Sequence, residues 1–135
     1  MVIHADTSFL VDLLRESRRD AAGPATSLLA ALAGDEIRVG VHVLCELLAG
    51  AEAAQQPAVE RQRVRRLCEG LVVSYPDERF PAVYARLLKA LSGSGRSIGA
   101  MDVLIAAGAL VDGAAIVTRN RRHFERVPGL TVRTY

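Results

Sequence analysis

The chain has 135 residues, the usual size of one domain, so we expect a single domain over residues 1–135. Half of the residues are hydrophobic and 24% are charged, which excludes intrinsic disorder as the main description. The formal net charge of +2 excludes a strongly basic DNA-binding tail, and an aromatic content of 4% disfavours a nucleic-acid site built on base stacking. The N-terminus carries no export signal, and Asp102 and Asp112 interrupt the longest apolar tract, 98–117, so we expect a cytoplasmic protein that does not span or bind a membrane.

Short apolar runs predict strands, and apolar residues at helical spacing predict helices. In the first half we expect a strand at 2–5, a helix after the polar cluster 6–8, a helix from Gly23-Pro24 to a C-cap at Gly34, a strand at 37–41, and helices at 42–51 and 57–69. In the second half we expect a strand at 71–74, a helix at 80–91, a loop at 92–95, a helix at 100–112, a strand at 114–118, an arginine-rich turn and a strand at 130–133.

This alternation of helices with strands that are apolar throughout predicts an α/β fold: three layers around a mostly parallel sheet of about five strands. In such sheets, ligands bind beyond the carboxyl ends of the strands. Functional residues are therefore expected where strands end and helices begin.

Four polar residues stand at such ends within apolar sequence: Asp6, Glu46, Asp102 and Asn120. A charge in apolar surroundings is costly unless it is paired, and a divalent cation relieves the repulsion among converging carboxylates. Ligands that are all oxygen favour Mg²⁺, with Mn²⁺ as a substitute, over zinc. Taken singly, Asp6 and Asp102 are also explained as helix N-caps, and Glu46 as the partner of a buried arginine.

Four segments carry a resemblance to a known family: DTSFLVDLL, CELLAG, IGAMDVLIAAGAL and TRNRRHFERVPGL, in that order. Together they resemble the PIN-domain ribonucleases, and within them the VapC toxins of bacterial toxin–antitoxin pairs, over Val2 to Leu130. The resemblance implies a PIN-like fold in which Asp6, Glu46 and Asp102 are the metal ligands and Asn120 is the fourth catalytic position. It also implies that the hydroxyls of Ser8 and Thr118 support the acidic cluster.

The chain departs from the family pattern at three positions: Val43 replaces a common Ser or Thr, Gly108 replaces a common His, and Asn120 replaces a common acid. The amide lowers the negative charge of the site. We therefore expect one firmly held Mg²⁺, with a second recruited by RNA phosphate.

The resemblance implies a Mg²⁺-dependent endoribonuclease toxin that hydrolyses RNA phosphodiester bonds with a metal-activated water and leaves a 5′-phosphate and a 3′-hydroxyl. It implies a homodimer and a VapB-like antitoxin partner, and no specific DNA binding by this chain alone. An acidic pocket needs a basic rim to bind RNA. The arginines expected there are Arg15, Arg119, Arg121 and Arg122.

Two other classes of function are compatible with parts of the sequence. A phosphoacceptor module needs a lysine near a strand end, and the only lysine, Lys89, falls within a predicted helix. A protein-binding module that keeps the fold with weak or lost nuclease activity stays open because of the amide at Asn120. Two further polar residues are not assigned to the site: Asp12 is expected on another helix face than Asp6, and His123 is expected to be a turn residue.

Overall fold

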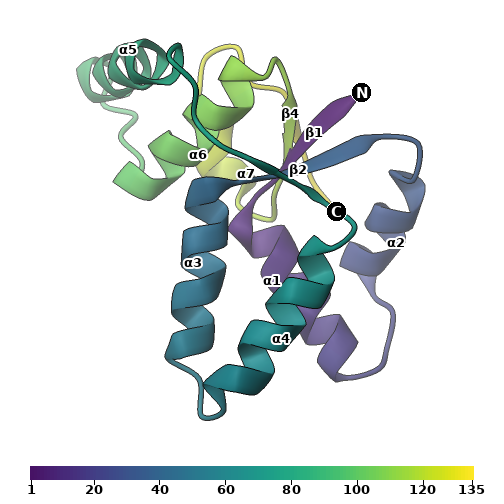
Figure 1. Cartoon of the computed structure of the whole chain (residues 1–135). Coiled ribbons are helices and arrows are strands. Elements are labelled where there is room, and N and C mark those ends of the chain that lie inside the picture. The colour runs from purple at the N-terminus through teal and green to yellow at the C-terminus, as the bar shows by residue number, and fades with distance from the viewer.

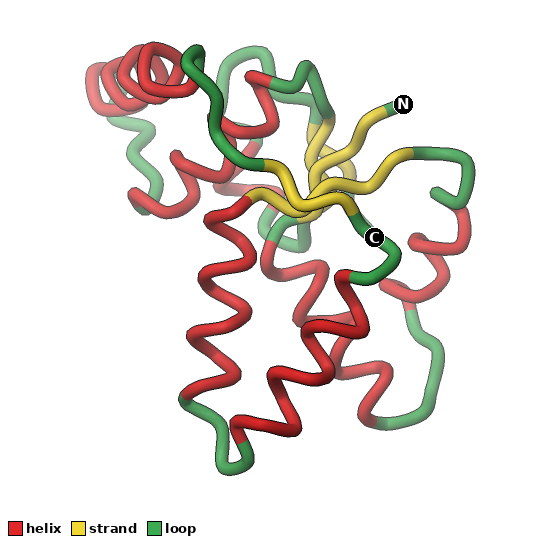
Figure 2. Tube along the Cα trace, in the orientation of Figure 1, coloured by secondary structure: helices red, strands yellow, loops and turns green.

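The computed structural model describes residues 1–135 and contains one five-stranded sheet (Figures 1 and 2). The strands are β1 (Val2–Ala5), β2 (Glu36–Gly40), β3 (Val72–Ser74), β4 (Ala115–Val117) and β5 (Val132–Arg133). Their order is β3-β2-β1-β4-β5, and every neighbouring pair is parallel. The predicted parallel sheet is confirmed, with β1 at its centre.

Helices cover both faces of the sheet and complete the three layers. They are α1 (Thr7–Arg18), α2 (Pro24–Ala31), α3 (Val41–Glu52), α4 (Pro57–Cys68), α5 (Phe80–Gly93), α6 (Ala100–Val111) and α7 (Arg121–Phe124). In Figure 1, α1 to α4 lie on one side of the sheet and α5 and α6 on the other. The predicted α/β class is confirmed.

The central strand is buried on both faces, as expected for a strand of a parallel sheet covered by helices on both sides. Ile3, His4 and Ala5 on β1 are at most 2% exposed, and Phe9 on the following helix is fully buried. The apolar tract 98–117 forms α6 and β4, as expected. None of the helices combines the length and the apolar character needed to cross a membrane.

Three local predictions were wrong. The helix that begins at Pro24 ends before Gly34, because Leu32 is buried at 1% exposure and its N–H bonds the carbonyls of both Leu28 and Leu29, which tightens the last turn. Residues 92–93 belong to α5 rather than to a loop, since the buried Leu91 keeps the last turn against the core. The arginine-rich turn contains α7, and the fully buried Phe124 anchors it.

Candidate active site

Asp6 lies directly after β1, at the carboxyl edge of the central strand. Its N–H donates to the Val117 carbonyl at 2.9 Å, and the residue is only 2% exposed. Although Asp6 occupies the N-cap position of α1, its side chain makes no capping hydrogen bond. Its Oδ2 instead accepts hydrogen bonds from Ser8 Oγ at 2.9 Å and Thr118 Oγ1 at 2.7 Å. Asp6 is therefore the N-cap residue of α1, as one interpretation of the sequence predicts, but capping does not account for the partners of its carboxyl.

The two hydroxyls that hold Asp6 are themselves held by the loop after β4. Ser8 and Thr118 are buried, and their oxygens lie 3.2 Å apart. The N–H of Arg119 donates to Ser8 Oγ at 3.0 Å, and the N–H of Asn120 donates to Thr118 Oγ1 at 2.8 Å. The loop that carries Asn120 is thus fixed to the carboxylate through two hydroxyls, while Asn120 itself is exposed.

Asp102 is the second carboxylate at this place. Burial raises the pKa of Asp6 above its ordinary value, the hydroxyl hydrogen bonds oppose the rise, and the negative charge of nearby Asp102 adds to it. Asp102 lies in the first turn of α6, whose N-cap is Gly99, so the N-cap interpretation of Asp102 is wrong. The structure thus brings Asp6 and Asp102 close enough for their charges to interact.

Glu46 lies on α3 and is joined to the residue that follows Asp6. Its Oε1 accepts a hydrogen bond from Thr7 Oγ1 at 2.6 Å, and the residue is half-buried. None of the ion pairs of the chain involves Glu46, so the alternative in which it pairs with a buried arginine is wrong. Glu46 is therefore joined to Thr7, the residue after Asp6, but it does not converge with Asp6 and Asp102 as the sequence predicts.

The donor set suits a hard divalent cation that keeps part of its water shell. Asp6 is a buried carboxylate with hydroxyl partners and a second carboxylate nearby, but no cationic side chain pairs with it. No three carboxylate, imidazole or thiolate groups in the chain converge closely enough to form a complete metal centre. Mg²⁺ is typically held by one or two carboxylates, with water and substrate phosphates as its other ligands. The residues present fit this pattern better than a closed protein cage.

His123 contacts the site, although the sequence predicts only that it is a turn residue. Its Nδ1 lies 2.9 Å from Asp102 Oδ2, and its side chain is 49% exposed. The side chain sits on α7, and the neighbouring Phe124 fixes this helix in the core. In the sequence, the only sign of this contact is that His123 follows Asn120 by three residues. The sequence gives a residue in a turn no predictable partner.

Two of the four arginines predicted for the basic rim pair with Asp12. Arg119 Nη1 lies 2.8 Å from Asp12 Oδ1, and Arg15 Nη1 lies 3.5 Å from the same oxygen. Arg121 pairs with Glu125 one helical turn later on α7. The fourth arginine, at position 122, is exposed and makes no ion pair. The structure therefore brings Arg15 and Arg119 together and leaves the other two separate.

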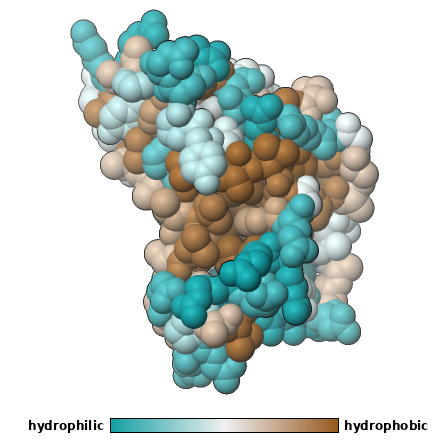
Figure 3. Space-filling model, in the orientation of Figure 1, coloured by the Kyte–Doolittle hydropathy of each residue, from teal (hydrophilic) through white to brown (hydrophobic).

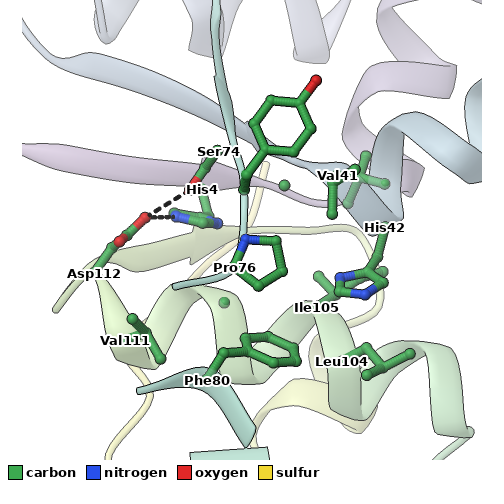
Figure 4. A pocket seen from close by; sticks show the side chains of 14 residues that line it. His4, Val41, His42, Ser74, Pro76, Phe80, Leu104, Ile105, Val111 and Asp112 are labelled. Carbon is green, nitrogen blue, oxygen red and sulfur yellow. Dashed lines mark hydrogen bonds and ion pairs between the residues drawn. The ribbon is translucent and has the colours of Figure 1, made fainter. Parts of the chain in front are cut away.

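A second polar cluster borders a pocket beside β3 and α6 (Figure 4). His4 Nε2 lies 2.7 Å from Asp112 Oδ2, Ser74 Oγ donates to the same oxygen at 3.1 Å, and Arg38 pairs with it at 3.1 Å. Burial lowers the pKa of His4, whereas the partners of Asp112 outweigh its own burial and hold the pKa of this carboxyl below its ordinary value.

This cluster contains Ser, His and Asp, but its geometry is wrong for a nucleophilic triad. In a triad the histidine accepts the serine proton and the aspartate holds the far side of the ring. Here Ser74 and His4 both bond Asp112, so the serine proton points at the carboxylate rather than at the imidazole. The cluster joins three strands to the end of α6 and is structural.

Comparison with known proteins supports one family. The PIN domain matches residues 3–130. The chain is 35% identical over 127 residues to Ribonuclease VapC19 of Mycobacterium tuberculosis, covering 93% of this chain and 94% of that protein. It is 28% identical over 130 residues to Ribonuclease VapC1 of Haemophilus influenzae, covering 96% and 95%.

Its fold resembles that of VapBC2 from Rickettsia felis, solved bound to a DNA fragment from their promoter. The TM-score is 0.92 at 24% identity, with 100% of this chain and 99% of that chain covered. The arrangement of the sheet and helices is therefore shared along the whole length. The chain belongs to the PIN-domain family, among the ribonucleases named VapC.

Proposed function

We propose that the protein is a Mg²⁺-dependent endoribonuclease and acts as the toxin of a toxin–antitoxin pair. The observation that carries the proposal is Asp6, a buried carboxylate that two hydroxyls aim but no side-chain cation neutralises. Such an arrangement costs folding free energy unless a cation binds. The relatives named ribonuclease support RNA as the substrate.

The carboxylates and the hydroxyls have different roles in the proposed site. Asp6 and Asp102 would hold Mg²⁺, and Glu46 is joined to the site only through its hydrogen bond with Thr7. Ser8 and Thr118 fix the rotamer of Asp6 by bonding one of its oxygens. When bound, Mg²⁺ supplies a polarised water for in-line attack and neutralises charge on the phosphate. Because both hydroxyls bond Oδ2 of Asp6, they fix the orientation of the carboxylate that would hold the cation.

The direct test is cleavage of RNA by the purified chain across a Mg²⁺ titration, with chelator as the zero point. We expect cleavage that depends on Mg²⁺, persists with Mn²⁺, and yields 5′-phosphate ends. A chain that binds a partner protein but cuts no RNA at any Mg²⁺ concentration would favour the alternative, a PIN-fold binding module without nuclease activity.

Replacing Asn120 with aspartate should tighten metal binding. The backbone N–H of Asn120 bonds Thr118, which itself bonds Asp6, so a carboxylate here adds negative charge close to the site. Titration calorimetry with Mn²⁺ should show a lower Kd for Asn120→Asp than for the wild type. Arg122→Gln, which raises the negative charge nearby by the same amount without a new oxygen anion, is the control. Equal gains in both variants would contradict a specific place for residue 120 at the site.

The partners we propose are a VapB-like antitoxin and a second copy of the chain. Crystallised relatives named VapBC are toxin–antitoxin complexes, which supports the antitoxin. Figure 3 shows an apolar area over α3 and the adjoining edge of the sheet, bordered by hydrophilic side chains of α4. Within the chain, Leu48 on α3 is 38% exposed and Val72 on the edge strand is 46% exposed. An apolar area of this kind favours protein contact.

A further inference from the structure

Asp12 joins three parts of the chain that are far apart in sequence. It lies on α1 with its side chain 15% exposed. Its Oδ1 accepts a hydrogen bond from Arg119 at 2.8 Å and lies 3.5 Å from Arg15. Its Oδ2 accepts a hydrogen bond from the hydroxyl of Tyr135, the last residue of the sequence, at 2.6 Å. Both carboxylate oxygens are therefore engaged.

Tyr135 is fixed from two sides. Its ring meets Phe9 edge to face, with ring centroids 5.1 Å apart and planes inclined at 63°, and Phe9 is fully buried. Burial, together with the negative charge and hydrogen bond of Asp12, raises the pKa of the Tyr135 hydroxyl above its ordinary value. The hydroxyl therefore keeps its proton at neutral pH and remains a donor to Asp12.

The cluster is adjacent to the catalytic carboxylate. The Tyr135 hydroxyl is also 3.4 Å from the Ser8 carbonyl oxygen, and the negative charge of Asp6 contributes to the raised pKa of the tyrosine. Arg119 also links the cluster to Ser8, because its side chain bonds Asp12 and its backbone N–H donates to Ser8 Oγ. One residue, Ser8, thus contacts both Asp6 and the cluster.

The balance of charge favours an anion at this cluster. One carboxylate faces two guanidinium groups, so the cluster keeps a net positive charge in the neighbourhood of Asp6. The side chains of Arg15 and Arg119 stay 53% and 52% exposed, and each uses one nitrogen on Asp12. Free guanidinium N–H groups held at a fixed spacing are suited to bind phosphate oxygens.

We propose that Asp12 and Tyr135 are positioning residues for RNA binding: they hold Arg15 and Arg119 as a pair that binds a backbone phosphate beside Asp6. This inference rests on the proposed ribonuclease function. Without Asp12, two like-charged, flexible side chains would repel each other and lose their common orientation. Tyr135 acts one step further away, since it fixes the carboxylate that fixes the arginines.

The direction in which Asp12→Asn changes the affinity for RNA distinguishes orientation of the two arginines from neutralisation of their charge. If Asp12 only occupied the two arginines, Asp12→Asn would free them, remove a negative charge and tighten RNA binding. If Asp12 orients them, the same substitution weakens RNA binding even though the protein becomes more positive. Tyr135→Phe changes no charge and keeps the ring on Phe9, so it tests orientation alone.

The experiment measures the Kd of a fluorescently labelled, mixed-sequence single-stranded RNA by anisotropy, and KM and kcat for its cleavage. We expect the Kd and KM to rise about tenfold for Asp12→Asn and about threefold for Tyr135→Phe, with kcat within about twofold of the wild type. The matched controls are Asp77→Asn, an exposed aspartate paired with Arg79, and Tyr75→Phe, at a tyrosine that is 69% exposed. Both should leave Kd, KM and kcat unchanged.

Two further measurements complete the test. In an Arg15→Gln/Arg119→Gln background, Asp12→Asn should have no additional effect on the Kd, because the groups it positions are gone. The dependence of log Kd on log salt should become shallower by about 0.7 for each RNA phosphate that the variant no longer binds. A lower Kd in Asp12→Asn, or an undiminished effect in the double background, overturns the inference. RNA binding with these effects but without any cleavage would instead contradict the proposed nuclease function.

Discussion

Asp6→Asn and Asp102→Asn should each lower Mg²⁺-dependent RNA cleavage by at least about a hundredfold, or about 3 kcal/mol of transition-state stabilisation. Asparagine keeps the shape of the side chain and loses the charge that attracts the cation. Glu46→Gln should also lower cleavage, since Glu46 bonds the hydroxyl of Thr7, the residue that follows Asp6. The measurement is the initial rate of RNA cleavage at saturating Mg²⁺.

The same Asp6 variant should make the metal-free protein more stable, which separates loss of metal from loss of fold. Asp6 is 2% exposed and its pKa is raised by burial, so its ionised form costs folding free energy at neutral pH. In thermal unfolding without Mg²⁺, Asp6→Asn should have a higher Tm than the wild type at pH 7. Added Mg²⁺ should raise the Tm of the wild type and not that of the variant.

The pH dependence of this difference follows from the sign of the pKa shift. A carboxyl whose pKa is higher in the folded than in the unfolded state binds protons more readily when folded, so it favours folding as the pH falls. The Tm difference between Asp6→Asn and the wild type should therefore shrink as the pH is lowered toward the ordinary pKa of an aspartate. Full cleavage activity in Asp6→Asn, or a Tm difference independent of pH, would refute the proposed role of Asp6.

Much of this site could be predicted from the sequence because its residues follow strands. Asp6 follows the apolar run of β1, and Thr118 and Asn120 follow the apolar run of β4. Since β1 and β4 are adjacent and parallel, their carboxyl ends meet at the same edge, and residues 6 and 118 are within hydrogen-bonding distance. Local pattern and parallel pairing together are enough to place them.

Contacts made from helix surfaces could not be predicted in this way. From the sequence, the position of Asp12 on α1 predicts the helix face on which it lies. It does not predict which residues contact that face, because this depends on where Arg119 and Tyr135 lie in the fold. The expected place of Asp12 on another helix face than Asp6 gave no sign of these contacts. His123 is a partner of Asp102 only because the buried Phe124 turns the arginine-rich segment into a short helix. Such contacts depend on tertiary packing, which periodicity does not encode.

The antitoxin proposal leads to an equally large expected effect: the complex of this chain with the product of its neighbouring gene should cleave RNA at least about a hundredfold more slowly than the free chain. Asp6 and Asp102 are close enough for their charges to interact, and no cationic side chain of the chain pairs with Asp6, so this acidic site attracts a basic side chain. An arginine of the partner inserted there would form charge-assisted hydrogen bonds and compete with Mg²⁺. Inhibition should therefore weaken as Mg²⁺ is raised.

Variants of the acidic residues test this mechanism separately from the rest of the interface. Asp6→Asn should bind the partner more weakly, because it removes one carboxylate that pairs with the inserted arginine, whereas Asp77→Asn, on the exposed turn before α5, should bind it as the wild type does. Calorimetry of the purified components gives both affinities. A complex that cleaves RNA as fast as the free chain would contradict the antitoxin proposal and leave the nuclease proposal standing. Inhibition that does not respond to Mg²⁺ would place the blocking contact away from these carboxylates, since a ligand that competes with the cation for them must bind more weakly as the cation concentration rises.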